Sequence, residues 1–324
     1  MKAAVTTKAG IPTVIEIKEV IKPEIISGWV LIKVKAFGLN RSELFTRRGY
    51  SPGVQFPRIQ GIECVGVIED DPSNTYEKGQ QVAAMMGGMG RYFDGGYAEF
   101  CLAPLEIVIP FKSGLRWSKL GAIPEMFQTV WGSLNQALEL SAGEILLIRG
   151  GTSSIGMLAC QIAKSMGVTV ISTTRNPEKI KRLRDNGSDH VLIDNGSITV
   201  PLNHLFPEGV YKILELIGTK TLKDSLKCIR NKGIFCMTGI LGDEWAMDSF
   251  SPMDDIPSLG KLTVYTGESK NISSELLQKF IDSVENGSIS LNIDTIFKLD
   301  EIRQAHEYME SNRAQGKLVV ELDN

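Results

Sequence analysis

Residues 144–167 read EILLIRGGTSSIGMLACQIAKSMG, and this stretch says most about the fold. A short apolar run ends at Gly150 and Gly151, and a pattern typical of an amphipathic helix follows. A glycine turn between a strand and a helix presents backbone N–H groups and the positive end of the helix dipole to a phosphate. The motif G-x-G-x-x-G is incomplete, because Ser153 stands at the middle position. Two interpretations remain at this point: a pyrophosphate site, or a plain turn with Ser154 as the helix cap.

The sequence around this turn favours the pyrophosphate site. After about residue 118, apolar runs alternate with helical patterns, which predicts a parallel, doubly wound sheet. The expected strands are 145–148, 168–172, 190–193, 211–217, 233–239 and a further one from 262, and the expected helices are 155–166, 177–186 and 219–230. Residues before 118 form short extended runs between Gly and Pro, at 29–35, 63–69, 81–84 and 96–102, and predict a mainly β region, whereas residues 122–140 carry a helical pattern. Helices at 274–286 and 300–311 and a last strand, KLVVEL, complete the pattern.

Composition excludes several classes of partner. The 324 residues carry 35 Lys and Arg against 38 Asp and Glu, a formal charge of −3, which argues against nucleic acid as a partner. No apolar run approaches the roughly 18 residues that span a bilayer, and the N-terminus has no secretory h-region. We therefore expect a cytoplasmic protein with no membrane partner. The five cysteines form no C-x-x-C pair, so neither a disulfide framework nor a cysteine-rich zinc site is expected.

The end of the second predicted strand indicates the cofactor. An NAD site usually places Asp or Glu there to bind the ribose hydroxyls, but no acidic residue lies between Gly156 and Glu178. Hydroxyls and cations in this region suit a 2′-phosphate, so NADPH is favoured over NADH. The alternative is that Arg175 belongs to the solvated face of a helix. The predicted cofactor-binding residues of this region are Gly150, Gly151, Thr152, Ser153, Ser154, Ile155, Gly156, Thr173, Thr174, Arg175 and Lys179, joined by Thr238, Gly239 and Ile240 at the end of a later strand.

Several segments together resemble the medium-chain dehydrogenase/reductase superfamily over nearly the whole chain. They are GWVLIKVKAFGLNRSELFTRRG, FPRIQGIECVGVIE, FDGGYAEF, IPEMFQTVWGSL, the glycine turn and GKLVVEL. The resemblance implies an α/β protein with a GroES-like β domain, residues 1–118 completed by 261–324, and a Rossmann domain, residues 119–260. It implies that the cofactor lies between the two domains, with Thr129 and Lys317 as further contacts. It also implies a homodimer formed through the edge strand LTVYTG.

The resemblance is to the zinc-free branch of the superfamily. Zinc members bind the metal through Cys in G-x-C-x-S-D and His in G-H-E, but this chain has Asn40 and Ile62 at these positions. Zinc needs about four N, S or O donors, and isoleucine supplies none. The branch includes NADPH:quinone oxidoreductases, enone and enoyl-thioester reductases, and zeta-crystallin. No metal site is therefore expected.

The missing metal ligands restrict the chemistry. Without a Lewis acid, the acceptor must be electrophilic itself, which predicts NADPH-dependent, zinc-independent hydride transfer to a quinone or an activated alkene. The resemblance points to Asn40 as a hydrogen-bond donor to the acceptor oxygen, and to Tyr50 as a second catalytic candidate that donates a proton. The alternatives are an enoyl-thioester or small-enone reductase, a non-catalytic NADPH-binding protein of the crystallin type, and a zinc alcohol dehydrogenase.

Overall fold

The computed structural model describes residues 1–323, which form two compact units. Unit 1 comprises Met1–Gln128 and the chain from Glu268 onward, and unit 2 is Thr129–Gly267. The domain limits inferred from the sequence, near residues 118 and 260, stay predictions.

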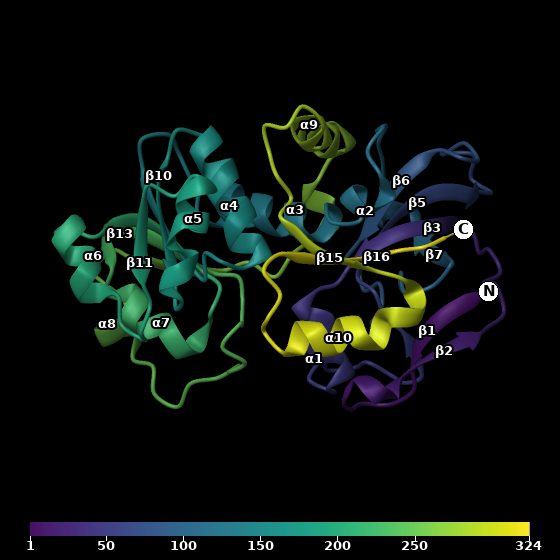
Figure 1. Ribbon diagram of the computed structural model, residues 1–324, viewed down its shortest axis with the longest axis horizontal. Helices are drawn as coiled ribbons and strands as arrows, with labels where there is room; N and C mark the ends of the chain where they lie inside the picture. Colours follow the sequence, from purple (N-terminus) through teal and green to yellow (C-terminus); the bar gives the residue numbers. More distant parts are fainter. Residues whose placement is uncertain (324) are drawn as a thin grey trace. The chain divides into compact units, whose positions relative to one another are not determined.

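Unit 2 contains a six-stranded parallel sheet with the strand order β11-β10-β9-β12-β13-β14. Helices α4 and α5 lie on one face of this sheet and α6 and α7 on the other (Figure 1). This is the predicted doubly wound arrangement, and β14 is an edge strand. The strands are β9 (Ile145–Arg149), β10 (Thr169–Thr174), β11 (His190–Ile193), β12 (Val210–Glu215), β13 (Ile229–Met237) and β14 (Lys261–Val264). The helices are α4 (Ser154–Ser165), α5 (Ile180–Asp185), α6 (Thr199–Leu205), α7 (Thr219–Leu226) and α8 (Pro252–Asp255), and a 3₁₀ turn, η4 (Pro177–Lys179), precedes α5.

Unit 1 is built on a seven-stranded sheet in the order β15-β16-β3-β5-β6-β8, with β7 paired to β3. A smaller sheet has the order β2-β1-β4. The strands are β1 (Lys2–Thr6), β2 (Ile15–Glu19), β3 (Trp29–Gly38), β4 (Arg58–Ile59), β5 (Glu63–Asp70), β6 (Gln81–Met85), β7 (Phe100–Pro104), β8 (Val108–Pro110), β15 (Ile293–Phe297) and β16 (Lys317–Glu321). The buried side chains of β3, including Val30, Ile32 and Val34, belong to the core of this unit.

The helices of unit 1 are α1 (Arg41–Arg47), α2 (Trp117–Leu120), α9 (Ser274–Glu285) and α10 (Ile302–Glu310), and α3 (Pro124–Trp131) begins in unit 1 and ends in unit 2. Helix α10 lies against α1 and β2 and follows β15 along the chain (Figure 1). Short 3₁₀ turns are η1 (Pro12–Val14), η2 (Leu105–Ile107), η5 (Ser269–Asn271) and η6 (Leu299–Glu301). No helix within residues 1–323 is long and apolar enough to cross a membrane.

Two elements differ from the sequence-based expectation. The strand expected at 96–102 begins only at Phe100, because the backbone N–H groups of Gly96 and Tyr97 donate to the oxygens of Gly61 and Gln60 in a loop. The helical pattern after residue 122 is not uniform, since α3 passes into a π-helical turn, η3 (Gly132–Ala137). A side chain at Gly132 would overlap the ring of Tyr265, so this position admits only glycine without rearrangement.

Candidate functional site

The glycine turn of unit 2 has the geometry of a strand-to-helix phosphate site. Gly150 has a φ of +92°, a conformation that favours glycine, and its N–H donates to Thr173 Oγ1 at 3.1 Å. A Cβ at Gly151 would lie 2.7 Å from Ser172 Cβ, and one at Gly156 would lie 2.6 Å from the Gly150 oxygen. Glycine at these three positions therefore permits both the turn and the close approach of α4 to the sheet.

The first turn of α4 offers free donors. Ser153 caps the helix, and its Oγ accepts the Gly156 N–H at 3.0 Å, so the cap is Ser153 and not Ser154. The backbone N–H groups of Thr152, Ser154 and Ile155 meet no acceptor within residues 1–323. They are available to an anion at the positive end of the helix dipole.

The predicted 2′-phosphate residues near the end of β10 fall into two groups, the hydroxyls of two threonines and the side chains of two cations. The Thr173 hydroxyl accepts from Gly150, and the Thr174 hydroxyl is 3.2 Å from the Asn176 oxygen and accepts the Asn176 N–H at 3.1 Å. Both hydroxyls are therefore engaged in the turn. Arg175 is exposed and Lys179 is half-buried, and neither side chain forms an ion pair within the described chain.

Thr129 and Thr238 are brought together by Ser133. The Ser133 hydroxyl donates to the Thr129 carbonyl oxygen at 2.7 Å and lies 2.8 Å from Thr238 Oγ1. Cys236 Sγ lies 3.4 Å from the same Thr238 oxygen, and burial raises the pKa of this thiol to about 11. The N–H of Gly239 donates to the Glu215 oxygen, and Ile240 follows in the same loop. Thr129, Thr238 and Gly239 thus belong to one hydrogen-bonded group at the carboxyl end of β13, and Ile240 is the next residue of the chain.

Arg149, directly before the glycine turn, was not among the predicted residues. Its guanidinium is fully buried and pairs with both oxygens of Asp194 at 2.8 and 2.9 Å and with Asp224 at 2.8 Å. Ser225 Oγ accepts a further bond at 2.9 Å and donates to the buried carboxylate of Glu215 at 2.6 Å. The burial of Arg149 lowers its pKa, but these carboxylates outweigh that effect and raise it. Arg149 therefore ties the turn to α7 and to the loop after β11.

In unit 1, Asn40 lies in a buried group of charged side chains. Lys317 Nζ donates to Asn40 Oδ1 at 2.6 Å and to Glu63 Oε1 at 2.9 Å, and Asn40 Nδ2 donates to the same Glu63 oxygen at 2.9 Å. Glu125 Oε2 is 3.7 Å from the ammonium. Burial alone would lower the pKa of Lys317, but the charges of Glu63 and Glu125 raise it by more. The pKa of Lys317 is therefore above its usual value, and the side chain remains an ammonium.

Strand register explains how residues so far apart in sequence meet. Gly38, at the end of β3, pairs with Val319 of β16, so Lys317 lies beside the residues that follow β3. Ala36 pairs with Val65 of β5, which places Glu63 on the other side of the end of β3. Two flanking strands therefore each begin with a charged residue next to Asn40.

A second buried group lies beneath α1. Glu43 accepts hydrogen bonds from the backbone N–H of Asn40 at 2.7 Å, from that of Ile62 at 2.8 Å, and from the Tyr97 hydroxyl at 2.6 Å. His306 Nε2 lies 3.2 Å from the same hydroxyl. Burial raises the pKa of Glu43 to about 7 and lowers that of His306 to about 3, the second with help from the charge of Arg47. This group holds the backbone of the Asn40 loop.

Tyr50 lies outside both buried groups. Its side chain is 55% exposed, and its backbone N–H donates to the Phe45 oxygen at 2.9 Å. No side-chain hydrogen bond joins Tyr50 to Asn40 within residues 1–323.

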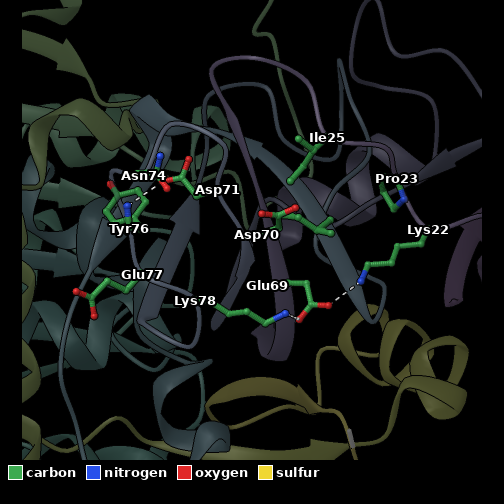
Figure 2. A pocket seen from close by; sticks show the side chains of 11 residues that line it. Lys22, Pro23, Ile25, Glu69, Asp70, Asp71, Asn74, Tyr76, Glu77 and Lys78 are labelled. Atoms are coloured by element: carbon green, nitrogen blue, oxygen red, sulfur yellow. Dashed lines mark hydrogen bonds and ion pairs between the residues drawn. The ribbon is translucent and has the colours of Figure 1, made fainter.

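A surface hollow of about 670 Å³ in unit 1 contains none of the predicted site residues. Figure 2 shows Glu69 between Lys22 and Lys78, with N–O distances of 2.9 and 3.8 Å. Asp71 accepts hydrogen bonds from its own loop, including the backbone N–H of Tyr76. Glu69 is paired with two lysines and Asp71 with its own loop, and nothing in this hollow gives a reason to assign it a ligand.

Comparison with known proteins identifies the family. Residues 26–113 match the alcohol dehydrogenase GroES-like domain, and residues 186–320 match the zinc-binding dehydrogenase domain. Quinone oxidoreductase from Mus musculus is 28% identical, and the alignment covers 99% of this chain and 97% of the mouse protein. The chain belongs to the medium-chain dehydrogenase/reductase superfamily, in its quinone oxidoreductase branch. It is an oxidoreductase of this superfamily.

Solved structures agree with this medium-chain reductase fold. A mycobacterial protein complexed with NADPH is 22% identical with a TM-score of 0.86, and 99% of each chain is covered. A 2-haloacrylate reductase is 23% identical with a TM-score of 0.85, and both chains are covered completely. The α/β class with a GroES-like domain and a Rossmann sheet is thereby confirmed.

The residues of this medium-chain reductase do not fit the zinc site of its metal-binding relatives. Ile62 is apolar and buried, and the ammonium of Lys317 lies 2.6 Å from Asn40 Oδ1, where it would repel a bound cation. Within residues 1–323, no three His, Cys, Asp or Glu side chains gather in a way that could hold a metal ion.

Sequence analysis missed Glu43, Glu63, Glu125 and Arg149 in this reductase. A usable signal existed for Glu63 and Arg149, since each is a charged residue at one end of an apolar strand. Their partners lie 254 and 45 residues away, so the sequence gives no local sign of the pairing.

Proposed function

We propose that this protein is an NADPH-dependent, zinc-independent oxidoreductase that transfers hydride to a quinone or an activated alkene. The observation that carries the proposal is Asn40 bound to Lys317 at the position where zinc relatives need a metal ligand. This donor set supplies hydrogen bonds and no Lewis acid, so the acceptor must already be electrophilic. The name of the mouse relative favours a quinone, and that of the 2-haloacrylate reductase favours an activated alkene as the alternative acceptor.

The chain's own residues orient the acceptor and stabilise the negative charge that develops on its oxygen. A bound NADPH supplies the hydride. As the hydride bonds to carbon, the π electron pair moves to the acceptor oxygen, and the Asn40 amide donates a hydrogen bond to that developing oxyanion. We assign protonation of the oxyanion or enolate to the Tyr50 hydroxyl, which is exposed and therefore in exchange with solvent.

NADPH is preferred over NADH in this proposal because of Arg175 and Lys179. Arg175 is exposed and without an ion-pair partner in residues 1–323, and no acidic residue lies between Gly156 and Glu178, where an NAD site places the one that binds the ribose hydroxyls. The pyrophosphate is assigned to the free N–H groups of the α4 turn, Gly150–Gly156, with Thr152, Ser154 and Ile155 as donors. The group of Thr129, Thr238, Gly239 and Ile240 is assigned to the nicotinamide end. Thr173 and Thr174 contribute by shaping the turn.

A homodimer is part of the proposal. Strand β14 is the edge of its sheet, and Val264 on it is 56% exposed, so its outer backbone groups are available to the same strand of a second copy. Gel filtration is expected to give twice the chain mass of 35.6 kDa. A mass equal to that of one chain would refute the proposed homodimer. The cytoplasmic location stays a prediction.

The test is consumption of NADPH, followed by its near-ultraviolet absorbance, after the protein has been treated with a chelator. Quinones, enones, a 2-haloacrylate and an enoyl thioester serve as acceptors, with NADH in parallel. We expect turnover of at least one class, equal rates with and without added zinc, and a preference for NADPH. Activity that appears only with zinc would refute the proposal, as would turnover of simple alcohols alone.

A further inference from the structure

The Asn40 carboxamide is held between two groups of opposite hydrogen-bonding character. Its oxygen accepts from Lys317 at 2.6 Å, and its nitrogen donates to Glu63 at 2.9 Å. An ammonium has only donors, and a carboxylate only accepts. Rotation of the amide by 180° would place NH₂ against the ammonium and C=O against the carboxylate. Only one orientation satisfies both neighbours.

The two groups that impose this orientation are themselves fixed. Glu63 is completely buried, and its second oxygen accepts the backbone N–H of Glu125 at 2.8 Å. Lys317 is 2% exposed and lies within 3.7 Å of Glu125 as well as Glu63. The ion pair of Lys317 with Glu63 is thus anchored to β5, β16 and the first turn of α3.

Gly38 provides the space for this arrangement. A Cβ there would lie 2.5 Å from Glu63 Oε1 and in contact with the Lys317 side chain. The backbone of Asn40 is fixed separately by Glu43, which accepts its N–H at 2.7 Å. Both the position and the rotation of the carboxamide are therefore determined by buried residues.

One donor of the carboxamide is left over. Nδ2 carries two hydrogens, of which Glu63 takes one, and the other meets no acceptor within residues 1–323. Asn40 retains 8% of its exposure, so the amide is not sealed from solvent.

We propose that Lys317 and Glu63 are positioning residues that lock the Asn40 carboxamide with its second Nδ2 hydrogen facing the acceptor oxygen. This rests on the proposed function. Lys317 then acts through Asn40. The family resemblance, by contrast, suggests that Lys317 contacts the cofactor. The lock selects acceptors whose reacting group ends in a hydrogen-bond-accepting oxygen, because a flipped amide would present its own oxygen and repel them.

A double-mutant cycle on Lys317→Met and Asn40→Ala tests the lock. Asn40→Ala is expected to lower kcat/KM for the best acceptor roughly 100-fold, the loss typical of one oxyanion donor. Lys317→Met removes the donor to Asn40 Oδ1, so that Glu63 alone holds the amide, and is expected to lower it roughly tenfold, an order-of-magnitude value for misorientation. Because Lys317 acts through Asn40, its substitution should change the rate of the Asn40→Ala protein less than twofold.

Three controls separate this role from others. Titration with NADPH, followed by cofactor fluorescence, should give a Kd for Lys317→Met within twofold of the wild type. Lys317→Arg keeps a donor to Asn40 Oδ1 and should recover most of the lost rate. Lys279→Met, which removes an exposed lysine paired with Glu275, should leave the rate unchanged.

The outcomes are distinct. Additive effects of the two substitutions, or a tenfold loss of NADPH affinity in Lys317→Met, would overturn the lock. If Lys317→Met does not fold, Glu63→Gln takes its place, because glutamine accepts or donates, so that Lys317 alone holds the orientation of the amide. Its effect too must vanish in the Asn40→Ala protein. A wild-type protein that reduces none of the acceptors refutes the proposed function, and the positioning role falls with it.

Discussion

Replacement of Glu43 by Gln should change how the free energy of unfolding depends on pH. The Glu43 carboxyl is buried beneath α1, and burial raises its pKa from 4.5 to about 7. A carboxyl with a raised pKa holds its proton in the folded state while the unfolded chain releases it. Its contribution is therefore favourable below about pH 4.5 and is lost as the pH rises toward 7. One pKa unit corresponds to about 1.4 kcal/mol, so the loss across this window is about 3 kcal/mol.

His306 works in the opposite direction. Its pKa is lowered from 6.5 to about 3, so the stability of the neutral folded form is complete above pH 6.5 and is lost as the pH falls toward 3. The groups that face these two are Tyr97, Glu63 and Arg47. Between about pH 4.5 and 6.5 the two slopes oppose each other, and the wild-type stability is expected to be nearly flat.

Urea unfolding at several pH values measures the effect. Relative to the wild type, Glu43→Gln should gain about 3 kcal/mol of unfolding free energy between pH 4.5 and 7. The new glutamine amide at this position faces the backbone N–H groups of Asn40 and Ile62, which can lower the free energy of unfolding by the same amount at every pH. Such a constant loss does not alter the dependence of this free energy on pH. Glu24→Gln, at an exposed glutamate, serves as the matched control. A difference between Glu43→Gln and the wild type that stays constant with pH would refute the account of this buried carboxyl.

Two further predictions concern unit 2. Arg175→Ala should weaken NADPH binding about tenfold to a hundredfold, because one charged contact contributes roughly 1.5 to 3 kcal/mol, while the NADH affinity changes little. Equal losses for both nucleotides in parallel titrations would show that Arg175 does not bind the 2′-phosphate. Arg149→Met leaves the carboxylate of Asp194 buried without its partner and should lower the unfolding free energy by about 3 to 5 kcal/mol in chemical denaturation. A loss below about 1 kcal/mol would mean that water or another cation takes over the role of the guanidinium.

The parts of the fold that were predictable depend on local signals. The strands and helices around Gly150 follow from hydrophobic periodicity and turn residues within a few positions of each other. The short strands β1 and β2 and helix α1 carry weaker patterns and depend on their packing against β3 and α10, so the sequence did not indicate them. Position 132, where α3 passes into the π turn, admits only glycine because of the ring of Tyr265, which lies 133 residues away.

The candidate site was predictable only in part for the same reason. Asn40 was found by resemblance, and its role as a donor to the acceptor oxygen stays a prediction. Its orientation depends on Lys317, 277 residues away, and on Glu63, which no motif singled out. Thr173 and Thr174 show that residue type alone also misleads. Their hydroxyls are suited to a phosphate, but both accept backbone N–H groups of their own turn.

Arg149 and Lys317 together show why buried charge in this fold is better explained by orientation than by stability. Each cation is almost completely buried among carboxylates. A buried ion pair gains little net free energy over apolar side chains of similar volume, because desolvation offsets the attraction. Its hydrogen bonds are directional, however, and each cation lies within one or two contacts of a segment that the proposed function uses: Gly150 follows Arg149, and Asn40 accepts from Lys317. If stability alone explained these groups, replacing a whole cluster with apolar residues would leave turnover intact, whereas fixed orientation requires that turnover fall even where the fold survives.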